Sequence, residues 1–138
     1  MLSRASMRNK TVILTTLNKA WAANNTMIDL YLACFRQGHK IRHLLDHLVI
    51  VTLDQKAQDR CLQLHPHCFM LGTIGVDFSG EKLFMTKDYL RMMWRRIKFL
   101  EAVLKLEYNF IFSVQHNKPK DFHLKGLIYL CWKMLALC

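Results

Sequence analysis

The chain has 138 residues, of which 52% are hydrophobic and 22% are charged. This length allows one compact domain and is too short for two, and the composition excludes an intrinsically disordered chain. Twenty basic and ten acidic side chains give a formal net charge of +10, which is compatible with an anionic ligand. Charge alone does not separate a nucleotide from a nucleic acid, but no helix-turn-helix, zinc-finger or aromatic-basic stacking pattern accompanies it.

The first half of the chain predicts two strands and two helices. Residues 11–17 are apolar apart from threonines and rich in β-branched side chains, which is typical of a strand covered on both faces. A helix is expected to begin near residues 24–26 and to stop at Gly38. Residues 48–53 predict a second buried strand, and residues 55–64 predict a short helix. The first helix is expected to bury the side chains spaced three and four residues apart, Met27, Leu30, Tyr31, Cys34 and Phe35.

The second half predicts a short strand over 68–71, a loop over 72–83, a long helix and a final strand over 108–113. Thr86 is the expected N-cap of the long helix, and Glu101 is expected to pair with Lys105 four residues later. Its apolar stripe is expected to consist of Leu90, Met93, Trp94, Ile97, Leu100 and Leu104.

This alternation of strands and helices predicts an α/β fold with a parallel sheet and right-handed crossovers. In such sheets ligands bind at the carboxyl ends of the strands, near the point where the strand order reverses. The ends of the strands at 11–17, 48–53 and 108–113 should therefore share one rim.

Four blocks, in this order, resemble the plant nucleotide-diphospho-sugar transferase domain, a glycosyltransferase family of GT-A fold. They are residues 8–18 (RNKTVILTTLN), 47–54 (HLVIVTLD), 61–68 with the sequence HPHC at its end, and 94–100 (WRRIKFL) leading to FIFS at 110–113. The resemblance implies a partial Rossmann-like, nucleotide-binding half over residues 8–113, followed by a divergent tail over 114–138. The family commonly has a glycine where this chain has Glu107, so the end of the long helix is expected to be less well capped.

The resemblance also implies a binding site for a UDP-sugar on the rim. The residues expected to contact the nucleotide are Thr15, Thr16, Leu17, Asn18, Asp54, Arg95 and Lys98. Simpler roles stay open for each of them. The threonines can be ordinary strand residues, Asn18 a turn former, Asp54 a helix cap, and the basic side chains a solvated helix face.

Family members continue from the FIFS strand into an Asp-Val-Asp motif that holds Mn²⁺ or Mg²⁺ on the diphosphate. Here Val114, Gln115 and His116 stand in those positions. We therefore expect no metal site, no catalytic residue and no useful transferase activity, with UDP-sugar binding weak or lost. The alternative hypothesis is a basic binding module for nucleic acid or an anionic surface.

Five scattered cysteines match no zinc module, and we expect buried thiols rather than a disulfide framework. A zinc site built from Cys61, His65, His67 and Cys68 is not expected. The family implies a Golgi location and a polysaccharide or glycoprotein acceptor. No signal peptide or membrane anchor is recognised in the sequence, so a cytosolic location is expected if the chain is made as written.

Overall fold

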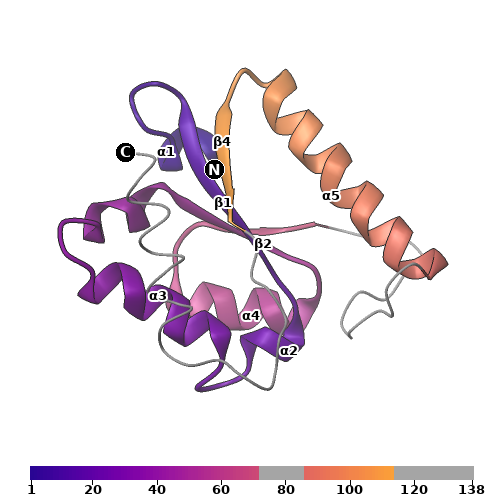
Figure 1. Ribbon diagram of the computed structural model, residues 1–138, viewed down its shortest axis with the longest axis horizontal. Coiled ribbons are helices and arrows are strands. Elements are labelled where there is room, and N and C mark those ends of the chain that lie inside the picture. Colours follow the sequence, from indigo (N-terminus) through magenta and orange to yellow (C-terminus); the bar gives the residue numbers. More distant parts are fainter. Residues whose placement is uncertain (72–85, 114–138) are drawn as a thin grey trace.

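The computed structural model describes residues 1–71 and 86–113. Its strands form one parallel sheet in the order β3-β2-β1-β4 (Figure 1). The strands are β1 (Thr11–Leu17), β2 (Leu48–Thr52), β3 (Cys68–Met70) and β4 (Asn109–Ser113). The expected α/β fold with a parallel sheet is confirmed, whereas the predicted loop over 72–83 and the tail over 114–138 lie outside the described residues.

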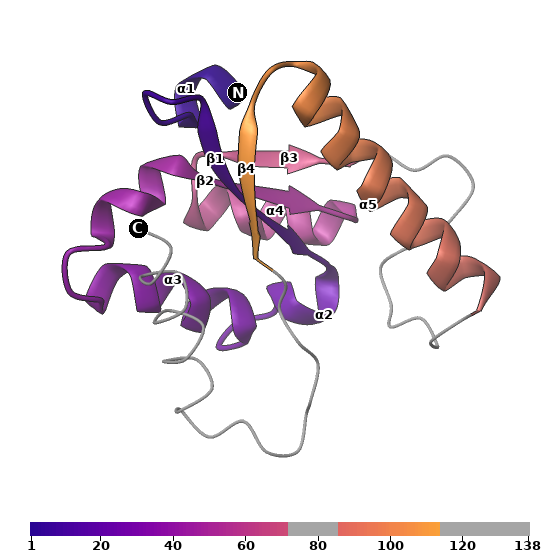
Figure 2. The same ribbon diagram turned by 45° about the horizontal axis from the view of Figure 1, so that its top comes forward.

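Helices cover both faces of the sheet (Figures 1 and 2). The described helices are α1 (Leu2–Ala5), α2 (Lys19–Ala22), α3 (Met27–Gln37), the 3-10 helix η1 (Arg42–His47), α4 (Gln55–Leu64) and α5 (Lys87–Lys105). Helices α2, α3 and α4 pack on one face, and α1 and α5 pack on the other. The sequence did not predict α1, α2 or η1, because four to six residues are too few to show a helical period.

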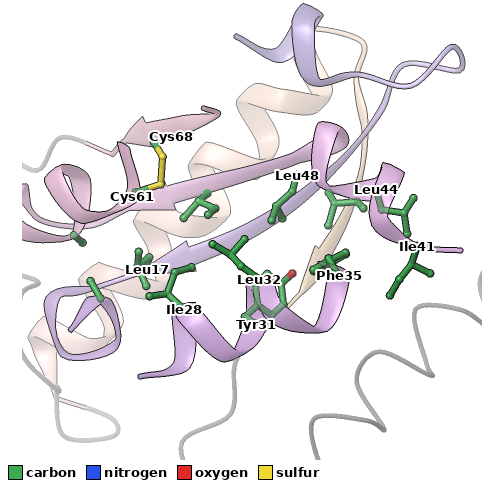
Figure 3. Packing of buried hydrophobic residues seen from close by; sticks show 14 residues of the cluster. Leu17, Ile28, Tyr31, Leu32, Phe35, Ile41, Leu44, Leu48, Cys61 and Cys68 are labelled. Carbon is green, nitrogen blue, oxygen red and sulfur yellow. A yellow bond between two sulfur atoms is a disulfide. The ribbon is translucent and has the colours of Figure 1, made fainter. Parts of the chain in front are cut away.

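Alternate residues of the central strands serve two separate cores. Ile13 of β1 and Ile50 of β2 point into the larger core, which α3 and α4 close (Figure 3). Val12 and Leu14 of β1 point to the opposite face and contact α1 and α5. Every residue of β2 is buried, as expected for a strand inside a parallel sheet with helices on both sides.

The buried face of α3 differs from the expected one. Its buried residues are Ile28, Tyr31, Leu32 and Phe35, whereas Leu30 is 45% exposed. Ile28, Leu32 and Phe35 belong to the cluster in Figure 3 that packs against β1 and β2. The predicted helical period is correct, but the buried face is shifted by about one residue from the predicted one. Both faces are apolar, so contact with the sheet determines which of them is buried.

The apolar stripe predicted for α5 is also wrong in most of its members. Val103 is 2% exposed and packs with Phe99 and Leu100 on the second core. Four of the six predicted stripe residues are exposed instead: Leu90 (40%), Trp94 (62%), Ile97 (49%) and Leu104 (54%). The predicted Thr86 cap is confirmed, because its Oγ1 accepts a hydrogen bond from the amide of Tyr89 at 3.3 Å. The predicted ion pair between Glu101 and Lys105 is also confirmed, at 2.7 Å.

The cysteine prediction is wrong for one pair. Cys61 and Cys68 form a disulfide, with their Cα atoms 6.0 Å apart (Figure 3). It links the last turn of α4 to the first residue of β3, while Cys34 in α3 is a free thiol. The two cysteines are seven residues apart in sequence, so only the turn between α4 and β3 could bring them together. The disulfide leaves neither sulfur available as a thiolate ligand for zinc.

Candidate nucleotide-binding rim

The strand order reverses between β1 and β4. From β1 the chain moves outward to β2 and β3, and it then crosses to the other side of β1 to form β4. The carboxyl ends of β1 and β4 therefore flank the switch point, where open parallel sheets bind their ligands. Figure 2 shows the ends of β2 and β3 pointing towards α5.

At the switch point, Thr15 lies beside Ser113 in the register of β1 and β4. The Thr15 Oγ1 hydroxyl donates a hydrogen bond to the carbonyl oxygen of Ser113, 3.2 Å away. Ser113 is 6% exposed, and its own Oγ has no hydrogen-bond partner among the described residues. A buried hydroxyl without a partner is uncommon in folded proteins and costs free energy.

The end of β1 leads directly into α2. Asn18 is the N-cap of α2, and its Oδ1 accepts a hydrogen bond from the amide of Trp21 at 3.2 Å. The side chain of Leu17 is buried in the larger core, and its carbonyl accepts from the amide of Leu53 at 2.9 Å. Thr16 faces the other side of the sheet and is half-buried. Of these three, Leu17 has its side chain turned inward, away from any ligand on the rim.

Asp54 joins two strand ends through both of its carboxylate oxygens. Oδ1 accepts from the amide of Ala57 at 2.9 Å, which caps α4, and Oδ2 accepts from the amide of Lys19 at 2.7 Å, at the start of α2. The capping role that the sequence left open is therefore present. The second bond was not foreseen, since it connects residues 35 positions apart.

The basic candidates lie on α5, whose Phe99 stacks on Phe69 of β3 with ring centroids 5.4 Å apart. Lys98 is exposed, and Arg95 is half-buried. Arg96, between them in sequence, is also half-buried, and burial lowers the pKa of its guanidinium. Its Nε makes no hydrogen bond in the part of the chain that the structure describes. The structure thus brings Thr15, Asn18 and Asp54 to one edge, and it places the cations on a separate helix.

The described residues include no cluster of side chains of the kind that holds a metal ion. Within residues 1–71 and 86–113, no three His, Cys, Asp or Glu side chains are close enough to share a metal ion. Val114, Gln115 and His116 lie outside the described residues, and by sequence they supply an imidazole but no carboxylate. Mg²⁺ and Mn²⁺ prefer carboxylate and other oxygen ligands, so these residues do not supply the donor set that the family motif uses.

One feature of the rim was missed by sequence reasoning. Ser113 was recognised only as the last residue of a strand, although its buried hydroxyl lies next to Thr15 at the switch point. The available signal was its place at the end of the last predicted strand, because polar residues at such positions face the ligand edge.

The order of the parallel sheet and the helices on both of its faces define an α/β protein with a partial Rossmann-like fold. The family model for nucleotide-diphospho-sugar transferases matches residues 43–115, a little over half of the chain. The chain belongs to this family, which is glycosyltransferase-like.

Two curated relatives come from Arabidopsis thaliana. The uncharacterized protein At4g15970 is 50% identical over 128 residues, which is 90% of this chain and 35% of the relative. The uncharacterized protein At1g28695 is 45% identical over 118 residues, which is 82% of this chain and 36% of the relative. The chain therefore spans about a third of the length of the curated relatives it matches. No solved structure matches.

Proposed function

We propose that this chain binds the nucleoside diphosphate part of a UDP-sugar at the β1–β4 rim, without a metal ion, and that it transfers no sugar by itself. Family membership supports a nucleotide-sugar ligand. The observation that carries the location is the switch point, where Thr15, Asn18 and Ser113 lie at adjacent strand ends. Threonine and asparagine side chains can bind a base or ribose because they donate and accept hydrogen bonds without bringing charge.

The proposed lack of transfer rests on residues 114–116. Transfer from a nucleoside diphosphate requires the leaving diphosphate to be stabilised, and in this family two aspartates and a cation supply that stabilisation. The sequence Val-Gln-His offers no carboxylate at those positions. Losing such a clamp costs several kcal/mol of transition-state stabilisation, which corresponds to a rate reduction of several orders of magnitude. A polysaccharide or glycoprotein acceptor is proposed only for full-length proteins of the family.

The disulfide supports an oxidising compartment for this part of the chain. Disulfides persist in the secretory pathway and are rare in the cytosol, where thiols are kept reduced. The Cys61–Cys68 disulfide thus favours the Golgi lumen that the family resemblance implies over the cytosol. The described helices include none that is long and apolar enough to cross a lipid bilayer.

Calorimetric titration of UDP into the 138-residue chain, with and without Mn²⁺, tests the proposal. We expect saturable binding with a dissociation constant that Mn²⁺ does not change, and no release of sugar from UDP-glucose. If UDP binds neither with nor without Mn²⁺, the binding part of the proposal is refuted. Manganese-dependent sugar transfer would refute the other half.

A pair of variants on α5 tests whether the helix contacts the diphosphate. Lys98→Gln should weaken UDP binding and leave the binding of uridine unchanged, because uridine lacks the phosphates. Lys105→Gln is the matched control, since Lys105 lies on the same helix and is paired with Glu101 at 2.7 Å. Equal effects of the two substitutions would show that only the overall charge matters.

A further inference from the structure

A second candidate binding site lies at the opposite end of the sheet from the nucleotide rim. A pocket of about 500 Å³ is formed between the end of α3, the 3-10 helix η1 and the end of α4. Helix η1 leads into the first residue of β2, and the segment after α4 leads into β3. The pocket is therefore at the amino ends of the strands. Its volume lies in the range of small-molecule sites and is much larger than one inorganic anion needs.

The lining of this pocket is rich in cationic and titratable groups. Arg36, Arg42, His43 and His65 line it, and the only acidic side chain among the lining residues is Asp46. Within the described residues, neither Arg36 nor Arg42 makes a salt bridge or a side-chain hydrogen bond.

A paired arginine elsewhere in the fold gives the contrast. Arg60 on α4 reaches Asp29 on α3 at 3.0 Å, so the fold satisfies that guanidinium internally. Two guanidinium groups without an acidic partner, in one concave site, form the arrangement that recognises carboxylate and phosphate oxygens.

One wall of the pocket is held rigidly. His65 is 6% exposed, and its Nε2 lies 2.7 Å from the carbonyl oxygen of Leu48, to which it donates a hydrogen bond. The proton of the neutral ring is thereby assigned to Nε2, which leaves Nδ1 as a hydrogen-bond acceptor. The Cys61–Cys68 disulfide encloses the segment that contains His65. His65 lines the pocket together with Arg36 and Arg42, and a polar ring with two guanidinium groups suits a ligand that carries both hydroxyl groups and an acidic group.

We propose that this pocket binds a small hydroxylated organic acid of the size of a sugar acid. Its carboxylate contacts Arg36 and Arg42, and one of its hydroxyl groups donates to His65. The site is separate from the nucleotide rim and does not depend on the proposed UDP binding.

The test titrates the full chain with three probes, sodium glucuronate, glucose and inorganic phosphate, by calorimetry and by NMR of the histidine side chains. Glucuronate should bind saturably and shift the ring signals of His65. Glucose should not bind because it lacks the charge, and phosphate should bind at least about tenfold more weakly because it lacks the sugar hydroxyls. Phosphate binding as tightly as glucuronate would overturn the assignment to an organic acid.

Two variants distinguish binding at a specific site from a general effect of positive charge. Arg42→Gln should weaken glucuronate binding by about tenfold or more, the effect of losing one charge-assisted hydrogen bond. Lys40→Gln is the control, because Lys40 is exposed, lies two residues away and does not line the pocket. Equal weakening by both variants, or no saturable glucuronate binding to the wild-type chain, would overturn the proposal. UDP is also titrated into each variant, and we expect its affinity to be unchanged. If UDP displaces bound glucuronate, the two ligands share one site and the proposal of a separate site is wrong.

Discussion

At the residue scale, Asp54 shows how one side chain can position several elements of the rim. It caps α4 and also holds the amide of Lys19 at the start of α2. The ends of β1 and β2 are thereby joined in addition to their strand pairing, which places Asn18 beside them. Such rigidity would favour the proposed nucleoside site, because each loosely held group must be ordered when a ligand binds.

Removal of this carboxylate should therefore destabilise the protein. We expect Asp54→Ala to lower the free energy of unfolding by about 2 kcal/mol, through loss of a cap and of a second charge-assisted hydrogen bond. Asp54→Asn should cost about half as much, because its amide oxygen can still accept one of the two bonds. Urea denaturation measures both values. An alanine variant as stable as the wild-type protein would contradict the role.

Glu107 occupies a position that favours glycine. Its φ is 61°, in the left-handed region, and it follows α5 in a Schellman motif. The amide of Tyr108 bonds the carbonyl of Val103 at 3.3 Å, and the amide of Glu107 bonds the carbonyl of Leu104 at 2.8 Å. This motif usually has glycine at the left-handed position, because a Cβ is unfavourable there. The glycine that the family resemblance implies at this position thus has a physical reason.

Glu107→Gly should raise the free energy of unfolding by about 0.5–1 kcal/mol, since relief of the left-handed strain exceeds the added chain entropy. The lost ion pair with Lys10, at 3.3 Å, is exposed and contributes little. Glu107→Gln is the control, because it removes the charge and keeps the Cβ. Thermal unfolding of the three proteins would detect the difference, and equal stabilisation by both substitutions would assign the effect to charge.

At the scale of elements, α5 has two apolar faces and buries the less obvious one. Val103 packs on the second core, whereas its neighbour Leu104 is exposed. Hydrophobic periodicity detects an apolar stripe but does not state which stripe meets the sheet. The side chains of β1 and β2 on that face determine which stripe of α5 is buried, and these strands are far from α5 in sequence.

Alanine substitutions at these adjacent positions should give opposite results. Val103→Ala should lower the free energy of unfolding by about 2 kcal/mol, because it removes buried methyl groups and leaves a cavity. Leu104→Ala should change it by less than about 0.5 kcal/mol. Alanine forms helices better than valine and slightly better than leucine, so helix propensity alone would favour Val103→Ala and cannot explain its larger expected cost. Chemical denaturation measures both, and a larger cost at Leu104 would show that the helix is oriented as the sequence pattern predicted.

The disulfide fixes the connection between α4 and β3. A loop of this length loses chain entropy when it is closed, and the stabilisation is about 2.5 kcal/mol in the chain-entropy model. We expect the free energy of unfolding of the Cys61→Ser, Cys68→Ser double variant to be lower than that of the oxidised protein by about this amount. Its stability should not change further on addition of a reducing agent, whereas the wild-type protein should lose stability. A wild-type chain indifferent to reductant would contradict the disulfide.

At the scale of the whole molecule, stability should fall in mild acid. Burial lowers the pKa of His65 below 6.5, against the opposing effect of its hydrogen bond to Leu48. Burial also lowers the pKa of His67. The unfolded chain then binds more protons than the folded chain below pH 6.5, so the stability present at neutral pH is lost as the pH falls from 6.5 towards the folded pKa values.

Unfolding measured at about pH 7.5 and about pH 5.5 tests this dependence. We expect the wild-type chain to be less stable at the lower pH, by at most about 1.4 kcal/mol per histidine for each pH unit below 6.5. His65→Gln should show a smaller loss, since glutamine can still donate to the Leu48 carbonyl and does not titrate. An identical loss in both proteins would exclude His65 as a cause.

Much of the fold could be predicted because it is encoded locally. The bounds of β1 and α4 agree with the structure to the residue, since an apolar run and a capped amphipathic segment mark them. Of the candidate site, the sequence placed Thr15, Asn18 and Asp54 at strand ends. It did not predict the hydrogen bond between Thr15 and Ser113, which joins residues 98 positions apart and depends on the strand order.

The sequence by itself determined the class of fold, the positions of the strands and the family, because these depend on apolar runs, caps and local motifs. Only the tertiary structure decided which faces of α3 and α5 are buried, that Cys61 bonds Cys68, and that arginines and histidines gather in a pocket at the amino ends of the strands. The physical reason is that a helix with two apolar faces, or a side chain without a local partner, takes its environment from segments that are distant in sequence.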